Sequence, residues 1–470
     1  MNETNGLHLT PAKRTMMVIV LMTGSFCTVL NQTLLATAYP TLMRYFSITT
    51  STVQWLTTGF LLVNGVMIPV SAYLSMRFNT KWLYIGAMLI FEAGTAVCAC
   101  APVYWILLLG RLIQAIAVGI TMPLIQTIML TIFPREQRGS AMGVVGLVIG
   151  LAPAIGPTLS GLIIDYMSWR DLFRLILPIG GVVILASLMT IQPVLTVTHP
   201  KLDWPSVGLS SLGFGMLLFG FSIVGTDGWT SYKTIFSIIA GLVIVFIMAL
   251  RQLNLTQPFL ELRVFTHRAF IIGTSLSSLV RMAMVGVEML IPIYLQEVRG
   301  LSALMSGLTL LPGALLYGLL SPITGRIFDR YGARDLTMLG MILLTLGTLP
   351  FAFINLTTPL IDITIFYAIR FIGISMVMMP ASTAGMNSLP NPILADGTAV
   401  NNTIRQVAAS IGTAILTSVL DDITKQGRLA GQKPLVATLN GYHAAFIVAV
   451  LFASLGIIIA SRFKPGRRNA

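Results

Sequence analysis

The sequence contains little charge, few cysteines and no phosphate-binding loop. Only 10% of its 470 residues are Asp, Glu, Lys or Arg. The three cysteines, Cys27, Cys98 and Cys100, lie inside apolar runs, which argues against a disulfide framework and against a metal site. No glycine-rich loop ending in Gly-Lys-Ser or Gly-Lys-Thr occurs, so direct ATP hydrolysis by this chain has no support. We expect no cofactor, no metal and no catalytic residue.

The sequence is instead dominated by hydrophobic residues. They make up 55% of the chain, the mean hydropathy is +0.86, and uncharged runs recur from end to end. This composition is typical of an all-α polytopic membrane protein. The formal net charge is +13, but the Lys and Arg residues lie in short segments between apolar runs and form no basic stripe. We therefore expect the lipid bilayer, and no nucleic acid, as a partner.

Windows of apolar length predict fourteen transmembrane helices, because about 20 residues cross a hydrocarbon core of ~30 Å. The expected ranges are 16–38, 52–74, 82–101, 103–132, 139–164, 172–194, 204–224, 234–253, 268–296, 304–328, 336–355, 361–388, 400–420 and 442–462. The longest segment between spans, residues 421–442, is expected to be a loop on the outer side.

The distribution of cations predicts the orientation. If both termini are cytoplasmic, 17 Lys and Arg residues lie in cytoplasmic segments, 8 lie in outer segments, and 4 lie within spans. The positive-inside rule favours this arrangement. Lys13 and Arg14 precede a first apolar run that has no clear cleavage site, so we interpret the run as a retained span. We expect a multi-pass protein of the cell membrane with both termini in the cytoplasm.

The two ends of the chain resemble each other. Residues 69–81 (PVSAYLSMRFNTK) align with residues 322–334 (PITGRIFDRYGAR), and Arg111-Leu-Ile recurs as Arg370-Phe-Ile. Parallel repeats of six spans are a transporter architecture. The repeats predict an N-terminal six-helix bundle in residues 1–195, two inserted transmembrane helices with linkers in residues 196–260, and a C-terminal six-helix bundle in residues 261–470.

Residues 139–162 form an uncharged run that is rich in glycine and proline. Four glycines spaced four, three and four apart share one helical face: Gly139, Gly143, Gly146 and Gly150. Such a face lets a second helix approach closely. Pro153 and Pro157 each remove a backbone hydrogen bond and loosen the helix. The run is either a pliable gating helix beside a transport path or a packing seam. Gly139-Ser-Ala also recurs as Gly397-Thr-Ala.

Three motifs resemble the major facilitator superfamily, in particular its fourteen-span drug:proton antiporter branch. Residues 150–161 (GLAPAIGPTLSG) resemble the antiporter signature of the fifth span. Residues 109–114 (LGRLIQ) resemble the arginine motif of the fourth span, and residues 325–334 (GRIFDRYGAR) resemble the cytoplasmic loop motif. The first-half copy of that loop is degenerate, since Met76 stands where Asp329 stands in the second half.

The resemblance implies two six-helix halves that exchange lipophilic compounds for protons by alternating access, and we expect a monomer. The glycine face and these motifs together predict gating roles for Gly146, Gly150, Pro153, Gly156, Pro157, Gly161, Gly325, Asp329, Arg330 and Arg334. The first span departs from the branch, because Asn31 stands where an acidic residue is usual. This departure leaves the first span without its usual proton-carrying group.

Six ionisable side chains fall inside predicted spans, where each costs roughly 2.5–3.5 kcal/mol to insert: Glu92, Arg111, Arg281, Glu288, Arg370 and Arg405. Glu288 is the leading candidate for proton coupling, because a carboxyl in an apolar cavity suits exchange with a proton gradient. The alternative is permanent structural pairing. Glu92 lies in a span that is usually peripheral, so structural pairing and proton coupling both remain open. Arg111 either assists proton transfer, as the family implies, or ties spans together through carbonyl groups.

Polar side chains near these charges predict a substrate path. Asn401 and Arg405, like Asn402 and Gln406, are i,i+4 pairs on one helical face, which either lines a path or joins two helices. The residues expected along the path are Asn31, Gln32, Gln114, Arg281, Asn401, Asn402, Arg405 and Gln406.

The sequence supports three functions to different degrees. Export of lipophilic drugs or toxic compounds driven by the proton gradient is favoured, by resemblance, on the glycine-proline span. Secondary transport of a defined metabolite, amino acid or lipid, including symport, is the alternative. A membrane-bound sensor or enzyme is disfavoured, because residues 421–442 contain Asp421 and Asp422 as their only acids and no cysteine.

Overall fold

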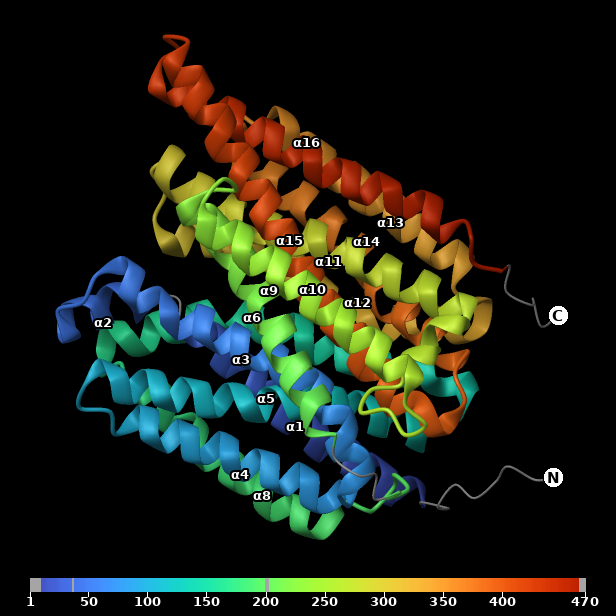
Figure 1. Ribbon diagram of the computed structural model, residues 1–470. Helices are drawn as coiled ribbons and strands as arrows, with labels where there is room; N and C mark the ends of the chain where they lie inside the picture. The colour runs from blue at the N-terminus through green and yellow to red at the C-terminus, as the bar shows by residue number, and fades with distance from the viewer. Residues whose placement is uncertain (1–9, 36–37, 199–202, 465–470) are drawn as a thin grey trace.

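Long helices packed side by side make up the molecule (Figure 1). The computed structural model describes residues 10–35, 38–198 and 203–464. Within these ranges, fourteen helices are long and apolar enough to cross a membrane, which confirms the predicted number. Three cations that entered the prediction of orientation, Lys201, Arg467 and Arg468, lie outside the described residues.

The first six spans form the lower half of Figure 1. Their helices are α1 (Pro11–Leu34), α3 (Thr50–Arg77), α4 (Thr80–Ala99), α5 (Tyr104–Ile132), α6 (Arg138–Tyr166) and α8 (Ile176–Thr190). Two short helices, α2 (Tyr39–Phe46) and α7 (Asp171–Arg174), lie between them. Local signals set several helix starts. Pro11 occupies the first turn of α1, and the Asn79 side chain accepts a hydrogen bond from the Lys81 N–H at the start of α4.

The last six spans form the upper half of Figure 1. Their helices are α11 (Arg268–Ile293), α12 (Ala303–Tyr331), α13 (Arg334–Thr348), α14 (Leu360–Asn387), α15 (Leu394–Leu429) and α16 (Pro434–Ala460). The first helix of each half begins, and the last helix ends, at the same end of the bundle. We call this end, where α1 begins and α16 ends, the terminus end (Figure 1).

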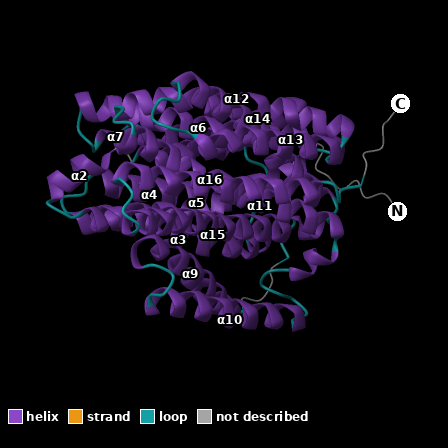
Figure 2. Cartoon of the chain, turned by 90° about the horizontal axis from the view of Figure 1, so that it is seen from above, coloured by secondary structure: helices purple, strands orange, loops and turns teal. Residues whose placement is uncertain are grey.

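The inserted pair, α9 (Trp204–Asp227) and α10 (Tyr232–Asn254), lies on one side of the bundle with α10 outermost (Figure 2). α9 contacts both α3 and α15, so the pair touches both halves. Arg251 forms an ion pair of 2.8 Å with Asp203, and its hydrogen bonds hold the pKa of that carboxyl below the usual value. The division at residues 195 and 260 remains a prediction.

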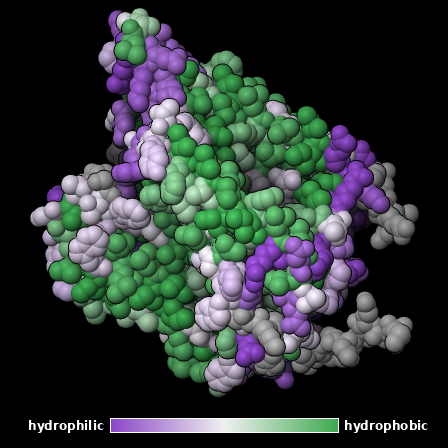
Figure 3. Space-filling model, viewed as in Figure 1, coloured by the Kyte–Doolittle hydropathy of each residue, from purple (hydrophilic) through white to green (hydrophobic). Residues whose placement is uncertain are grey.

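The expected outer loop at residues 421–442 is largely helical, so this expectation is wrong. α15 continues to Leu429 and α16 starts at Pro434, with Gly431 at a φ of 78° in the turn between them. The 36 residues of α15 span about 54 Å, which exceeds the ~30 Å of a hydrocarbon core. The sequence is polar there because the two helices project as a hairpin beyond the apolar band (Figure 3).

Candidate functional site

A buried polar network surrounds Arg111 in the first half. The guanidinium is 0% exposed and lies 4.3 Å from the Phe60 ring centroid. Its Nη1 donates to Asn31 Oδ1 at 2.5 Å and to Gln114 Oε1 at 2.8 Å. Gln114 in turn donates to Thr95 Oγ1 at 2.8 Å. Three predicted residues from α1 and α5 therefore meet, and amide oxygens take the place of a carboxylate beside the arginine.

Arg370 occupies the corresponding position in the second half. It is also 0% exposed, and its Nη2 donates to the backbone carbonyls of Ala283 and Met284 at 2.6 Å and 3.2 Å. Glu288 lies within electrostatic range of Arg370. Glu288 and Asn31 stand the same number of residues after the first residue of α11 and of α1. The two repeats thus place an arginine beside an amide in one half and beside a carboxyl group in the other.

Glu288 belongs to a group of charged and aromatic side chains from four helices. It lies in electrostatic range of Arg281 on its own helix and of Tyr367 on α14. Tyr317 on α12 is in range of Glu288, Arg281 and Arg405. Glu288 is half-buried, and no hydrogen bond to its carboxyl is present among the described residues. The structure therefore brings together three of the residues predicted for proton coupling and for the path.

The polar face of α15 contacts helices of both halves. Asn401 donates to Ser382 at 2.9 Å and accepts from Ser277 at 3.2 Å, so it joins helices within the second half. Asn402 donates to Gln126 Oε1 at 2.8 Å and so joins the two halves. The side chain of Gln406 lies beside Gly65 of α3. Both interpretations of this face, a lining and a joint between helices, retain support.

Two predicted residues lie apart from these groups. Gln32 is half-buried, and its side chain has no hydrogen bond among the described residues. The carboxyl of Glu92 lies against Gly180 of α8, where a Cβ atom would overlap it, and its Oε1 is buried without a hydrogen bond among the described residues. It is also in electrostatic range of Cys27 on α1. Glu92 therefore lies in the junction of α1, α4 and α8.

The glycine face of α6 meets α12 of the other half. A Cβ atom at Gly143 would lie 2.8 Å from Pro322 Cα, and one at Gly150 would lie 2.8 Å from the Gly318 backbone nitrogen. Gly146 contacts Ser321, and a Cβ atom at Gly325 would overlap the backbone of Gly139. The two helices thus form a close seam between the halves, which we call the α6–α12 seam.

The outer part of α6 has different neighbours. α6 remains one helix through Pro153 and Pro157. A Cβ atom at Gly156 would lie 3.0 Å from Thr33 Cβ on α1, within the same half, and Ser160 donates to the Leu34 carbonyl at 2.6 Å. No atom lies within 4 Å of a Cβ position at Gly161. The expected face toward the other half therefore ends near Gly150.

The carboxylate of Asp329 closes the α6–α12 seam at the terminus end. It accepts hydrogen bonds from the backbone N–H groups of Gly139 and Ser140, both at 2.7 Å, and from Ser140 Oγ at 2.5 Å. A carboxylate at a helix N-terminus is favoured by the helix dipole. Arg330 is exposed and lies over the Tyr331 ring, and Arg334 is half-buried. Asp329 thus joins the halves through hydrogen bonds, next to the close contact of Gly325 with Gly139.

The comparison with known families decides the identity of the fold. The protein-family model described as Major Facilitator Superfamily matches residues 21–413 of this chain. The chain belongs to the major facilitator superfamily. It is 46% identical over 460 residues to the uncharacterized MFS-type transporter YcnB of Bacillus subtilis (strain 168), which covers 98% of this chain and 97% of that relative.

Two further matches agree with this membership. The lincomycin resistance protein LmrB of Listeria monocytogenes is 40% identical over 445 residues, or 93% of this chain and 94% of that protein. The solved structure of the proton:xylose symporter XylE has a TM-score of 0.63 at 13% identity and covers 94% of this chain and 96% of that one, which shows the fold alone. The protein is therefore a multi-pass membrane transporter of small molecules with the expected all-α fold.

Sequence reasoning missed a second polar contact of this transporter at the terminus end. Arg138, 3% exposed, donates to Asn387 Oδ1 at 3.3 Å and to Asn391 Oδ1 at 3.2 Å in the other half. The signal was present, because Arg138 directly precedes Gly139 as Asp396 directly precedes Gly397 in the second repeat. Matched positions of the two repeats thus carry charges of opposite sign, which indicates a separate role for each residue.

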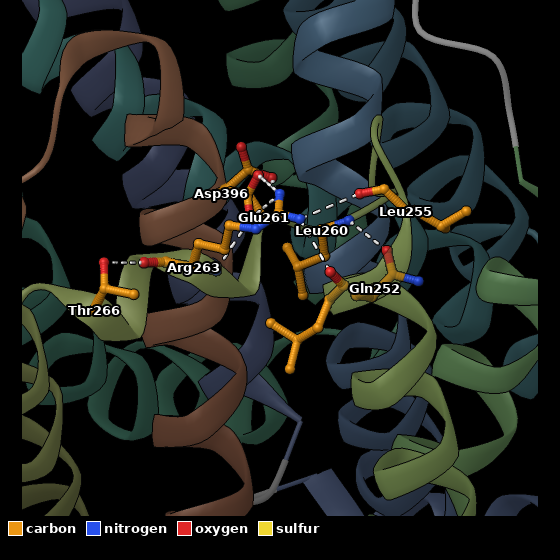
Figure 4. A network of polar contacts seen from close by, with 8 residues as sticks. Gln252, Leu255, Leu260, Glu261, Arg263, Thr266 and Asp396 are labelled. Carbon is orange, nitrogen blue, oxygen red and sulfur yellow. Dashed lines mark hydrogen bonds and ion pairs between the residues drawn. The ribbon is translucent and has the colours of Figure 1, made fainter.

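Asp396 connects α15 to the linker that follows the inserted helices (Figure 4). It is 2% exposed and accepts from the Glu261 N–H at 3.1 Å. Gln252 of α10 accepts from the Leu260 N–H at 3.2 Å, and Phe259 stacks on Tyr73 of α3 with ring centroids 6.2 Å apart. At the terminus end of α3, where Met76 replaces the acid of the loop motif, this transporter thus places the linker between α3 and α15.

Proposed function

We propose that this transporter exports lipophilic drugs or other toxic small molecules in exchange for protons, by alternating access. The lincomycin resistance relative supports drug export, because the two chains match over nearly their full lengths. An alternative, transport of a defined metabolite by symport, is separated from export by the experiment below.

The observation that carries the proton part of the proposal is the setting of Glu288. Its carboxyl is half-buried in the middle of a span, beside Arg281 and Arg370, and has no hydrogen bond among the described residues. A carboxyl that is locked by several hydrogen bonds resists protonation, whereas this one is free to bind and release a proton. Carboxyl groups within a span are candidates for function.

The α6–α12 seam supplies the element that changes between states. It joins the halves at the terminus end through a glycine face, Asp329 and Arg138. Beyond Gly150, α6 packs against α1 of its own half. We propose that substrate export requires this seam to open and close, while each six-helix half moves largely as a unit.

The test is uptake of a lipophilic fluorescent dye into inverted membrane vesicles, which corresponds to export from the cell. We expect uptake when the vesicle interior is acidic and its loss when an ionophore collapses the pH gradient. A rate of dye uptake that is the same with and without the pH gradient contradicts proton antiport. Stimulation by a gradient of the opposite sign indicates symport. Vesicles without the protein provide the background rate.

A further inference from the structure

Two intramembrane arginines of the second half form neither an ion pair nor a hydrogen bond to an oxygen atom in the part of the chain that the structure describes. Arg405 on α15 is 7% exposed, and no hydrogen bond or ion pair to its guanidinium is present among the described residues; its Nε is buried and unbonded. Arg281 on α11 is half-buried, and among the described residues its guanidinium donates only to the Met284 sulfur, at 3.9 Å. The two cations lie within electrostatic range of each other. By contrast, Arg111 and Arg370 bind amide or carbonyl oxygens.

The fold does not require these two cations. Arg281 precedes Glu288 by seven residues, and the residue that precedes Asn31 by seven in the first repeat is Gly24. Arg405 follows Gly397 by eight residues, and Leu147 follows Gly139 by eight. Arg111 and Arg370, which do bind the protein, occur in both repeats. The unpartnered pair is therefore an addition to one half rather than part of the shared framework.

The groups around the pair leave an excess of positive charge. Facing them are Tyr317 of α12, whose hydroxyl donates to Met378 Sδ at 3.3 Å, and the single carboxyl of Glu288. Ser278, one turn before Arg281, has a buried hydroxyl without a partner among the described residues. A buried charge without a counter-charge is strongly unfavourable. Arg370 also lies within electrostatic range of Glu288, so three guanidinium groups share one carboxyl, and an added anion would reduce this excess of positive charge.

We propose that Arg281 and Arg405 bind the anionic headgroup of the transported substrate, and that the substrate is an amphiphile with an apolar body and one negative charge. Guanidinium groups bind carboxylate or sulfonate oxygens with charge-assisted hydrogen bonds. Met284, which contacts Arg281, and Met378, which contacts Tyr317, suit an apolar body of variable shape. An inside-negative membrane potential drives such an anion outward. This inference rests on the proposed function and names its substrate class.

The test uses three probes that share one apolar body and differ in headgroup charge: 1-naphthoate, 1-naphthamide and 1-naphthylmethylammonium. Their binding to the purified full-length protein is measured by calorimetry in detergent micelles. We expect naphthoate to bind at least about tenfold more tightly than the amide, and the ammonium compound to bind most weakly. Each of Arg405→Gln and Arg281→Gln should reduce the preference for naphthoate over the amide to less than about threefold.

Matched variants separate a charge effect from damage to the fold. Arg405→Lys keeps the charge and should retain most of the preference. Ser410→Ala lies farther along α15, where the Ser410 hydroxyl donates to the Gln406 carbonyl of its own helix, and it should leave all three affinities unchanged. Equal binding of naphthoate and naphthamide to the wild-type protein overturns the proposal. So does an undiminished preference in both glutamine variants.

Transport of the lipophilic dye distinguishes the two proposals. If the dye moves in response to the proton gradient but the headgroup preference is missing, only the anion site is wrong. If naphthoate is preferred but no gradient-driven transport of the dye or of naphthoate occurs, the site stands and the export function is wrong.

Discussion

At the residue scale, the two halves use the same position for different chemistry. Arg111 faces the amide of Asn31, which cannot exchange a proton, whereas the matched Arg370 lies beside Glu288, which can. The first half therefore has a fixed polar network and the second half has a titratable one. This difference explains why the absence of an acid at position 31 is compatible with proton coupling by the molecule as a whole.

Removal of the Asn31 amide tests the fixed network. Asn31→Ala leaves the buried Arg111 guanidinium without its shortest acceptor, at 2.5 Å. We expect the free energy of unfolding to fall by about 1–3 kcal/mol, because a buried charged donor loses its partner. Thermal unfolding in detergent measures the change. Asn31→Asp keeps the acceptor and should be at least as stable as the wild type. A transition temperature of Asn31→Ala equal to the wild-type value would show that Arg111 finds another acceptor.

At the scale of elements, the α6–α12 seam depends on the absence of side chains on one face. A leucine at position 150 would meet the Tyr317 ring and the Gly318 backbone across the seam. We expect Gly150→Leu to lower the transport rate at least tenfold at normal expression, because the closed seam no longer forms. Gly161→Leu is the matched control on the same helix, since its site is open. Wild-type transport by Gly150→Leu would show that the close approach has no role.

A leucine at Gly156 should have a different effect from a leucine at Gly150. It packs on Thr33 of α1 inside the first half, so Gly156→Leu should destabilise that half rather than block the change between states.

The end of the seam depends on the charge of Asp329. Asp329→Asn retains one carbonyl oxygen but loses the charge and one acceptor for three donors. We expect slower transport with substrate affinity changed less than about threefold, because the variant shifts the balance between states and leaves the binding residues in place. Turnover and equilibrium binding are measured on the same preparation. Lost binding with normal turnover is the result that this role does not allow.

The sequence predicted the helices better than their contacts. Apolar length set fourteen spans, and glycine spacing identified the face of α6, because both follow from helical geometry alone. The sequence did not show that Gly156 faces α1 or that Asp329 caps α6, because these contacts depend on how the helices pack in three dimensions. The hairpin of α15 and α16 was missed because polar residues beyond the apolar spans can form either helices or loops. Arg138 and Asp396 were missed because each lies at the edge of a span.

At the scale of the whole molecule, α1 begins and α16 ends at the same end of the bundle, as an even number of spans requires (Figure 1). Cation placement predicts that this end is cytoplasmic. A reporter active only in the cytoplasm, fused at the C-terminus, should be active, and the same reporter inserted at Gly431 in the hairpin turn should be inactive. A reporter active only outside should give the reverse. Activity of one reporter at both sites would contradict the topology.

The central claim is that Glu288 carries the proton that drives export. The most direct measurement is gradient-driven dye uptake into inverted vesicles by Glu288→Gln, with Glu92→Gln as the matched control, at equal expression and with binding of the dye measured in parallel. The glutamine keeps the size of the side chain but cannot exchange a proton. We predict that Glu288→Gln binds the dye yet loses at least nine-tenths of the uptake, whereas Glu92→Gln retains it. Uptake by Glu288→Gln at the wild-type rate under the same pH gradient would contradict the claim.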